Sequence, residues 1–368
     1  MNSLQELRRL GQSIWLDYIR RDLITSGDLK RLIQEDGLRG ITSNPTIFAK
    51  AISEDSDYDS VIAQILRESP EVDLPALFEK IEIEDLRMAA DELRPVYDQT
   101  NGDDGFVSIE VSPRIGYDTD QSISEARRLW AEIARPNLMV KIPATYEGLP
   151  AIEQLISEGI NVNVTLMFSV SQYAQVAEAY LRGIERASDP GKVISVASFF
   201  VSRVDTAVDK ALEEVGTEEA LELRGKTAIA NAKLAYRRFR AVFSGPRFGK
   251  LKAHGVHLQK PLWASTSTKN KAYSDVMYVE GLIGPDTINS MPPETLEAFR
   301  DHGRARVALG EGKDDAEIVG KLARVGIILK SIGQELTDEG VDKFAKSYDE
   351  LIQALGKKRN AILQTLAA

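Results

Sequence analysis

One short run of residues, Leu138-Met139-Val140-Lys141-Ile142-Pro143, has the pattern of a buried strand that carries a single charged side chain. Successive side chains of a strand point to opposite faces, so Lys141 lies opposite the face formed by the branched residues. In a strand of a barrel, one face packs under helices and the other points to the barrel axis. We therefore expect Lys141 to point to the axis of a barrel.

Three more predicted strands bring polar side chains to the same inward face. They carry Asp17, Glu110, and the pair Asn163 and Thr165, each opposite an apolar face. Barrel interiors are usually filled by bulky branched residues, so a polar cluster there forms either a paired network or a substrate site. For one strand alone, a buried salt bridge that only stabilises the core is an equally good interpretation. The four strands together favour a site.

Strand and helix patterns alternate along the chain. Apolar runs predict strands at 14–18, 38–42, 106–111, 138–142, 161–168, 193–199, 261–265 and 276–280. Helical spacing lies between them, for example at 125–134 and 172–187. Strand-then-helix repetition implies parallel strands with crossover helices. Eight such units predict an α/β fold, a single (β/α)8 barrel of the TIM type with extra helices.

Two segments lie outside the strand–helix repeat. A helical insertion near 46–100 separates the second and third predicted strands, and apolar residues recur at helix spacing after Asp314. We therefore expect a barrel over residues 1–312 that includes the insertion, and a C-terminal helical extension over 313–368 that packs on the barrel. No low-complexity linker or internal repeat calls for a second domain.

Composition excludes several classes of function. The net charge of -10 argues against a nucleic-acid partner, and the 368 residues include no cysteine for disulfides, zinc or iron–sulfur sites. The N-terminus has no secretory pattern, and no stretch approaches the roughly 20 apolar residues of a membrane span. The three histidines form no metal-ligand pair on one helix face. We expect a cytoplasmic protein with no metal, nucleic-acid or membrane partner.

The inward polar set permits cleavage of a carbon–carbon bond through an imine. A lysine desolvated among apolar neighbours is partly neutral near pH 7, and a neutral amine attacks a ketone to form an iminium, which acts as an electron sink. The departing aldehyde needs a base at its hydroxyl, and imine formation needs a proton donor and acceptor. Two carboxylates and a threonine that holds a water supply these groups. The set therefore favours a retro-aldol reaction.

Seven segments of the chain resemble the transaldolase family. They are Trp15-Leu16-Asp17, Thr42-Ser43-Asn44-Pro45-Thr46, Val107-Ser108-Ile109-Glu110-Val111, Met139-Val140-Lys141-Ile142-Pro143-Ala144-Thr145, Asn161-Val162-Asn163-Val164-Thr165-Leu166, Ser198-Phe199-Phe200-Val201-Ser202-Arg203 and Trp263-Ala264-Ser265-Thr266-Ser267-Thr268-Lys269-Asn270. They occur in family order over about residues 13 to 295. The lysine segment and the Ser–Asn–Pro–Thr segment are highly specific in combination.

The resemblance implies a role for each matching position. Lys141 resembles the Schiff-base lysine, Asp17 the carboxylate that handles the proton of the cleaved hydroxyl, and Glu110 with Thr165 the pair that positions a catalytic water. The implied substrate-binding residues are Asn44 and Asn163 for hydroxyls, Ser198, Arg203 and Lys269 for phosphate, and Phe200 and Ser265 beside them. Family members often have arginine at the position of Lys269, and arginine binds phosphate in a bidentate way that lysine does not.

The reaction that the resemblance implies is part of the non-oxidative pentose phosphate pathway and uses no cofactor. A dihydroxyacetone unit passes from sedoheptulose 7-phosphate to glyceraldehyde 3-phosphate and gives erythrose 4-phosphate and fructose 6-phosphate. One alternative is an aldolase that releases free dihydroxyacetone, but such relatives resemble shorter chains with a tyrosine near the catalytic water, where this chain has Phe200 and Glu110. A non-catalytic sugar-phosphate sensor is the other alternative, although every catalytic-type position is filled. The sequence leaves open whether the protein is a monomer or a homodimer.

Overall fold

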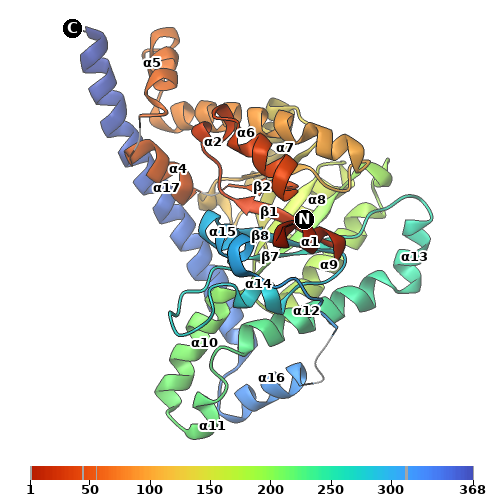
Figure 1. Ribbon diagram of the computed structural model, residues 1–368. Coiled ribbons are helices and arrows are strands. Elements are labelled where there is room, and N and C mark those ends of the chain that lie inside the picture. Colours follow the sequence, from red (N-terminus) through yellow and green to blue (C-terminus); the bar gives the residue numbers. More distant parts are fainter. Residues whose placement is uncertain (1, 44, 55, 311–313, 368) are drawn as a thin grey trace.

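Eight parallel strands close into a barrel in chain order, from β1 next to β2 round to β8 next to β1 (Figure 1). The computed structural model describes residues 2–43, 45–54, 56–310 and 314–367. The strands are β1 (Gln12–Asp17), β2 (Gly40–Thr42), β3 (Phe106–Glu110), β4 (Leu138–Pro143), β5 (Val162–Met167), β6 (Ser195–Phe200), β7 (Lys260–Ala264) and β8 (Thr287–Met291). The barrel confirms the fold predicted from the alternation of strands and helices.

Helices surround the barrel and fill the connections between its strands (Figure 1). The α-helices are α1 (Ser3–Arg9), α2 (Arg21–Thr25), α3 (Asp28–Arg31), α4 (Pro45–Glu54), α5 (Asp59–Glu68), α6 (Leu74–Gln99), α7 (Thr119–Ile133), α8 (Gly148–Ser157), α9 (Val170–Ile184), α10 (Ser202–Val215), α11 (Glu218–Leu221), α12 (Thr227–Phe243), α13 (Pro246–Lys252), α14 (Met277–Gly281), α15 (Pro293–His302), α16 (Asp315–Arg324) and α17 (Leu329–Ala367). A π-helix, η1 (Leu32–Asp36), and two 3-10 turns, η2 (Pro113–Ile115) and η3 (Pro190–Lys192), complete the set. In the described part of the chain, no helix combines the length and apolar character that a membrane crossing needs.

The two faces of the strands divide the apolar residues into two clusters. Outward side chains such as Val140 and Ile142 join the large cluster under the helices. A smaller cluster fills the barrel axis and consists of Trp15, Phe106, Met139, Ile194, Val196, Leu262 and Ile288. Most of these inward residues lie in the N-terminal half of their strands, so they close that end of the barrel. The inward positions toward the C-terminal ends are left for polar side chains.

The eighth strand lies later in the chain than predicted, and the prediction of a strand at 276–280 is wrong. That segment forms α14, whose Tyr278 hydroxyl donates to Asp205 on α10 at 3.0 Å. The strand that closes the barrel is β8, which pairs with β1 from Gln12↔Thr287 to Leu16↔Met291. Its polar residues stand on both faces, so the period-2 hydrophobic signal of a strand is absent from its sequence.

The segments beyond the simple repeat meet beside the barrel. Between β2 and β3 the chain forms α4, α5 and α6, and α17 runs past α4 and α5 (Figure 1). The α17 helix also approaches β5 closely: a Cβ added at Gly340 of α17 would lie 2.7 Å from the side chain of Leu166 on β5. Near the same point Thr337 donates a hydrogen bond to the Leu166 carbonyl at 3.3 Å. The domain boundary expected at 312/313 falls on residues outside the described ranges.

Gly40 provides a test of the packing at the barrel axis. A Cβ at Gly40 would stand 2.4 Å from the Trp15 ring, which is fully buried. Gly40→Ala should therefore destabilise the protein by about 1–3 kcal/mol, the usual cost of overpacking a core. Urea unfolding followed by fluorescence would measure this change. Gly249→Ala is the matched control, because Gly249 lies inside α13 with nothing within 4 Å of its added Cβ. Equal stability of the two variants would contradict the packing argument.

Candidate active site

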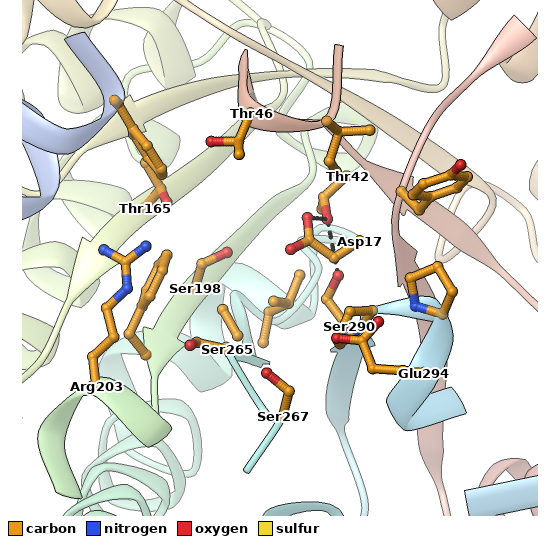
Figure 2. A pocket seen from close by; sticks show the side chains of 18 of the residues that line it. Asp17, Thr42, Thr46, Thr165, Ser198, Arg203, Ser265, Ser267, Ser290 and Glu294 are labelled. Carbon is orange, nitrogen blue, oxygen red and sulfur yellow. Dashed lines mark hydrogen bonds between the residues drawn. The ribbon is translucent and has the colours of Figure 1, made fainter. Parts of the chain in front are cut away.

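A cavity of about 550 Å³ opens at the C-terminal ends of the strands. This end of a (β/α)8 barrel carries the active site in essentially every characterised enzyme of the fold. Side chains from most of the strands reach it, and further residues come from α4, α10, α15, α17 and the loop after β7. Its lining includes Asp17, Thr42, Thr46, Lys50, Lys141, Thr165, Ser198, Phe200, Arg203, Ser265, Ser267, Lys269, Ser290, Glu294 and Phe344. Figure 2 shows this cavity from close by.

Lys141 reaches the wall of the cavity from β4 with its amine almost completely buried. The residue is 5% exposed, and Nζ donates to the Ser43 carbonyl at 3.0 Å. Oε1 of Glu110 lies 3.4 Å from the same nitrogen, and the Phe344 ring centroid lies 5.9 Å from it. The amine therefore has one carbonyl acceptor, one carboxylate and one aromatic face around it, in surroundings that exclude bulk water.

Glu110 and Thr165 flank Lys141 on the two neighbouring strands. Glu110 pairs in register with Lys141, and Thr165 pairs with Pro143, two residues further along β4. Both carboxylate oxygens of Glu110 and the hydroxyl of Thr165 are buried without a hydrogen-bond partner among the described residues. Burial raises the pKa of Glu110, against the opposing effect of the nearby Lys141 charge. Buried polar groups of this kind are usually satisfied by ordered water, so the arrangement suits a bound water beside the amine.

Asp17 lies at the end of β1 within a short chain of hydroxyl groups (Figure 2). Thr42 donates to its Oδ1 at 2.8 Å, and the Thr42 and Ser290 hydroxyls are 2.9 Å apart. These contacts orient the carboxylate, because the Thr42 hydroxyl is itself fixed by a second hydrogen bond. Asp17 is therefore an oriented carboxylate at the cavity wall, supplied by a different strand from Glu110.

Arg203 provides a cation on another side of the cavity (Figure 2). It is the second residue of α10, and its guanidinium lies 5.2 Å from the Phe200 ring centroid and 5.9 Å from that of Phe344. Burial lowers the pKa of Arg203, yet an arginine stays charged in proteins. Across the described part of the chain, its guanidinium makes no hydrogen bond or ion pair. Its donors are therefore available to an anion, next to a helix N-terminus that also favours negative charge.

The loop after β7 brings further donors to the same side. Lys269 Nζ donates to the Ser267 hydroxyl at 2.6 Å, and the Ser265 and Ser202 hydroxyls are 2.9 Å apart. Ser265 has a φ of 55°, a left-handed conformation that costs an ordinary residue on the order of 1 kcal/mol. Strained backbone of this kind concentrates at ligand sites. Together with Arg203, these residues form a cradle for a phosphate-like anion.

One predicted substrate ligand, Asn163, is not part of the cavity lining. Asn163 is fully buried, and its amide is occupied on both sides, because Nδ2 donates to Ser108 at 3.1 Å and Oδ1 accepts from Ser198 at 2.7 Å. Its direct contact is therefore with Ser198, which does line the cavity. Asn44 lies outside the described residues.

The structure adds residues that the sequence did not single out. Thr42 stands on the inward face of β2, and the hydroxyl pattern there could have indicated it. Ser290 was missed because the eighth strand was misplaced. Phe344 comes from α17, roughly 200 residues after Lys141 in the chain, and only the docking of that helix brings it to the site. Over the described ranges, no group of three or more histidine, aspartate or glutamate side chains is placed to hold a metal ion.

Comparison with known proteins relates the chain to one family. A family model described as Transaldolase/Fructose-6-phosphate aldolase matches residues 14–355. A protein named Transaldolase from Mycolicibacterium smegmatis is 47% identical over 358 residues, which cover 96% of each chain. The Transaldolase of Thiobacillus denitrificans is 46% identical over 361 residues, 97% of this chain and 100% of the relative. That of Thermobifida fusca is 47% identical over 361 residues, 96% of this chain and 98% of the relative.

The anion cradle can be tested with inorganic phosphate alone. Arg203→Ala should weaken phosphate binding by about 2–3 kcal/mol, because it removes charge-assisted hydrogen bonds. Lys50→Ala is the matched control, since Lys50 contributes a cation to the same cavity from α4 and should change the affinity far less. Isothermal titration calorimetry would measure both. An unchanged phosphate affinity in Arg203→Ala would show that the anion binds elsewhere.

Proposed function

This chain belongs to the transaldolase family, and we propose that it transfers a dihydroxyacetone unit between sugar phosphates through an imine on Lys141. The relatives named Transaldolase cover nearly the whole chain at 46–47% identity, which supports transaldolase function. One observation carries the assignment of the site. The buried amine of Lys141 lies beside a carboxylate without a hydrogen-bond partner, at the wall of a cavity that also holds an anion cradle.

Imine formation is the first task of the proposed site. The amine of Lys141 attacks the C2 carbonyl of a ketose phosphate, and a proton of the amine moves to the carbonyl oxygen. A second proton converts the resulting hydroxyl to water, which leaves as the iminium forms. Glu110 lies 3.4 Å from the amine and, through a water held with Thr165, delivers these protons. The raised pKa of Glu110 suits a group that must both give and take a proton.

Cleavage of the carbon–carbon bond is the task of the second carboxylate. Asp17 takes the proton of the C4 hydroxyl, the bond between C3 and C4 breaks, and its electron pair moves into the iminium to give an enamine on Lys141. The aldose leaves with the phosphate that Arg203 and Lys269 held. An acceptor aldehyde phosphate then enters the same cradle, and the steps run in reverse. Thr42 orients Asp17 throughout without taking part in proton transfer.

The substrates that fit these groups are ketose and aldose phosphates. With the phosphate at Arg203 and C2 at Lys141, the carbon chain spans a cavity of about 550 Å³ lined by hydroxyl groups and Asp17. Sedoheptulose 7-phosphate and glyceraldehyde 3-phosphate fit as substrates, and erythrose 4-phosphate and fructose 6-phosphate fit as products. Each has a phosphate for Arg203 and a carbonyl carbon for the reaction at Lys141. Transfer rather than release of free dihydroxyacetone requires the enamine to be kept from water. The Phe200 and Phe344 rings at the cavity wall support transfer.

The imine itself can be trapped. Borohydride added with fructose 6-phosphate should leave a three-carbon adduct on the peptide that contains Lys141, because the three-carbon enamine persists after erythrose 4-phosphate has left and borohydride reduces its iminium tautomer. Mass mapping of a proteolytic digest identifies the modified peptide. Lys269→Ala is the control that retains Lys141, and it should still be labelled at high substrate concentration. Labelling of another lysine, or of none, would refute the assignment.

Substitution of Asp17 and substitution of Glu110 should slow different steps of the reaction. Asp17→Asn should still form the imine but should break the carbon–carbon bond very slowly, so a six-carbon adduct accumulates. Glu110→Gln should form the imine slowly from the start, with turnover reduced on the order of 10²–10⁴-fold, as expected for a missing general acid–base. Rapid mixing, acid quench and intact-mass measurement separate the two adducts. If Asp17→Asn produced the three-carbon adduct at the wild-type rate, Glu110 would be the better candidate for the cleavage base.

A further inference from the structure

A second cavity, of about 280 Å³, lies behind Glu110. It is enclosed by the end of β3 and by α6, α7 and α17, and we call it the rear cavity. Asp73 and Pro75 line its outer part and are exposed to solvent. Glu110 lines its inner end. The volume is enough for several water molecules, since a water occupies roughly 30 Å³ in the liquid.

Glu110 thus stands between the rear cavity and the imine lysine. Its carboxylate is 3.4 Å from Lys141 Nζ. Lys141 and Thr165 line the cavity of about 550 Å³ at the candidate active site, which we call the front cavity. Both oxygens of Glu110 lack a hydrogen-bond partner among the residues that the structure describes. A group that exchanges protons with the imine therefore faces a space that the substrate does not fill.

One of the carboxylates in the rear cavity has no fixed partner. Glu79 forms an ion pair with Arg128 at 2.6 Å, and Glu125 accepts a hydrogen bond from the Ser112 backbone at 3.0 Å. Glu82, on α6 between them, is half-buried and makes no hydrogen bond or ion pair within the described ranges. Burial first, and then the charge of Glu110, raise the pKa of Glu82 to about 8. Glu82 therefore holds its proton to a higher pH than an exposed glutamate does.

The charges around Glu82 come from every element that encloses the rear cavity. They are Glu79 and Asp85 on α6, Glu110 on β3, Glu125 and Arg128 on α7, Arg114 on η2 and Tyr348 on α17. The acidic side chains in this set outnumber the basic ones, and both arginines form ion pairs with carboxylates other than that of Glu82. Arg128 binds Glu79, and Arg114 binds Asp349. Among the described residues of this set, no unpaired cation is therefore left to hold Glu82 in its charged form.

We propose that the rear cavity is a water-filled proton path and that Glu82 is a positioning residue that passes protons between solvent and Glu110. The proposal rests on the proposed imine mechanism. Forming an iminium from a neutral amine and a ketone consumes one proton and releases one water. That proton comes from Glu110, which regains one from Glu82, and Glu82 is protonated again by solvent water in the rear cavity. Hydrolysis of the imine sends a proton along the same groups in the opposite direction.

The proposed path would supply protons to Glu110 while a substrate occupies the front cavity. While a sugar phosphate is bound, its carbon chain and phosphate fill the front opening, and the Phe344 ring lies over the amine. If protons could reach Glu110 only through the front cavity, bound substrate would block them. The rear cavity keeps Glu110 in contact with solvent during the whole reaction, because its outer residues are not part of the front cavity lining.

Glu82→Gln tests the relay, because glutamine keeps the size of the side chain and loses the exchangeable proton. We expect kcat to fall about tenfold, less than the 10²–10⁴-fold loss for a general acid itself, with KM unchanged within twofold. In the wild type, the rate of imine formation should fall as the pH rises through about 8, where Glu82 loses its proton. That fall should be absent in Glu82→Gln. Rapid-quench mass measurement with fructose 6-phosphate gives the rate at each pH.

Two further variants make the outcome decisive. Glu92→Gln, which removes a carboxylate from the same helix outside the lining of the rear cavity, should keep the wild-type kcat and pH profile. Ala76→Leu fills part of the rear cavity without changing a charge, and it should slow imine formation as Glu82→Gln does. A wild-type kcat and pH profile in both Glu82→Gln and Ala76→Leu would overturn the relay. If the wild type itself formed no adduct on Lys141, the proposed function would fail instead, and the two failures are therefore distinguishable.

Discussion

The burial of the Lys141 amine beside the Glu110 carboxylate is the constraint on which the rest of the site depends. Removing two ionisable groups from water costs several kcal/mol for each ion unless the geometry and further hydrogen bonds compensate. Here the compensation is incomplete, since the carboxylate oxygens have no hydrogen-bond partner in the described part of the structure. The closed barrel tolerates this cost because its apolar cluster around Trp15 and Met139 stabilises the fold at the other end. A buried amine is thus maintained at the end where the loops and helices can reach it.

The same constraint explains why the anion cradle is built from aromatic rings as well as cations. Arg203 lies between Phe200 and Phe344, which hold its charge without consuming its hydrogen-bond donors. An acidic partner would have neutralised the guanidinium and reduced its attraction for phosphate. The aromatic surroundings also lower the local dielectric, which strengthens the attraction between a bound phosphate and the cation. Under the proposed function, a phosphate bound there would fix the far end of the substrate while its carbonyl reaches Lys141.

The sequence could predict the barrel and its inward carboxylates because those strands alternate cleanly. Lys141 and Glu110 each stand between apolar neighbours, so the face that they occupy follows from the pleat alone. The eighth strand could not be found in this way, because its polar residues lie on both faces and only pairing with β1 and β7 makes it a strand. The sequence could not identify Phe344 and Glu82 as cavity residues for another reason. Each lies on a long helix, where the hydrophobic pattern gives the buried face but not the cavity that the face encloses.

The C-terminal helix links the two cavities through a single face. Phe344 lines the front cavity, and Tyr348, four residues later and therefore on the same side of α17, lines the rear cavity. Tyr348 packs edge-on against Phe78 of α6 at 6.1 Å, and Phe78 packs in the same way against Phe48 of α4 at 5.4 Å. The helical insertion after β2 thus provides the surface on which α17 docks. A shift of α17 along this surface would move Phe344 and Tyr348 together, so the linings of both cavities depend on the position of one helix.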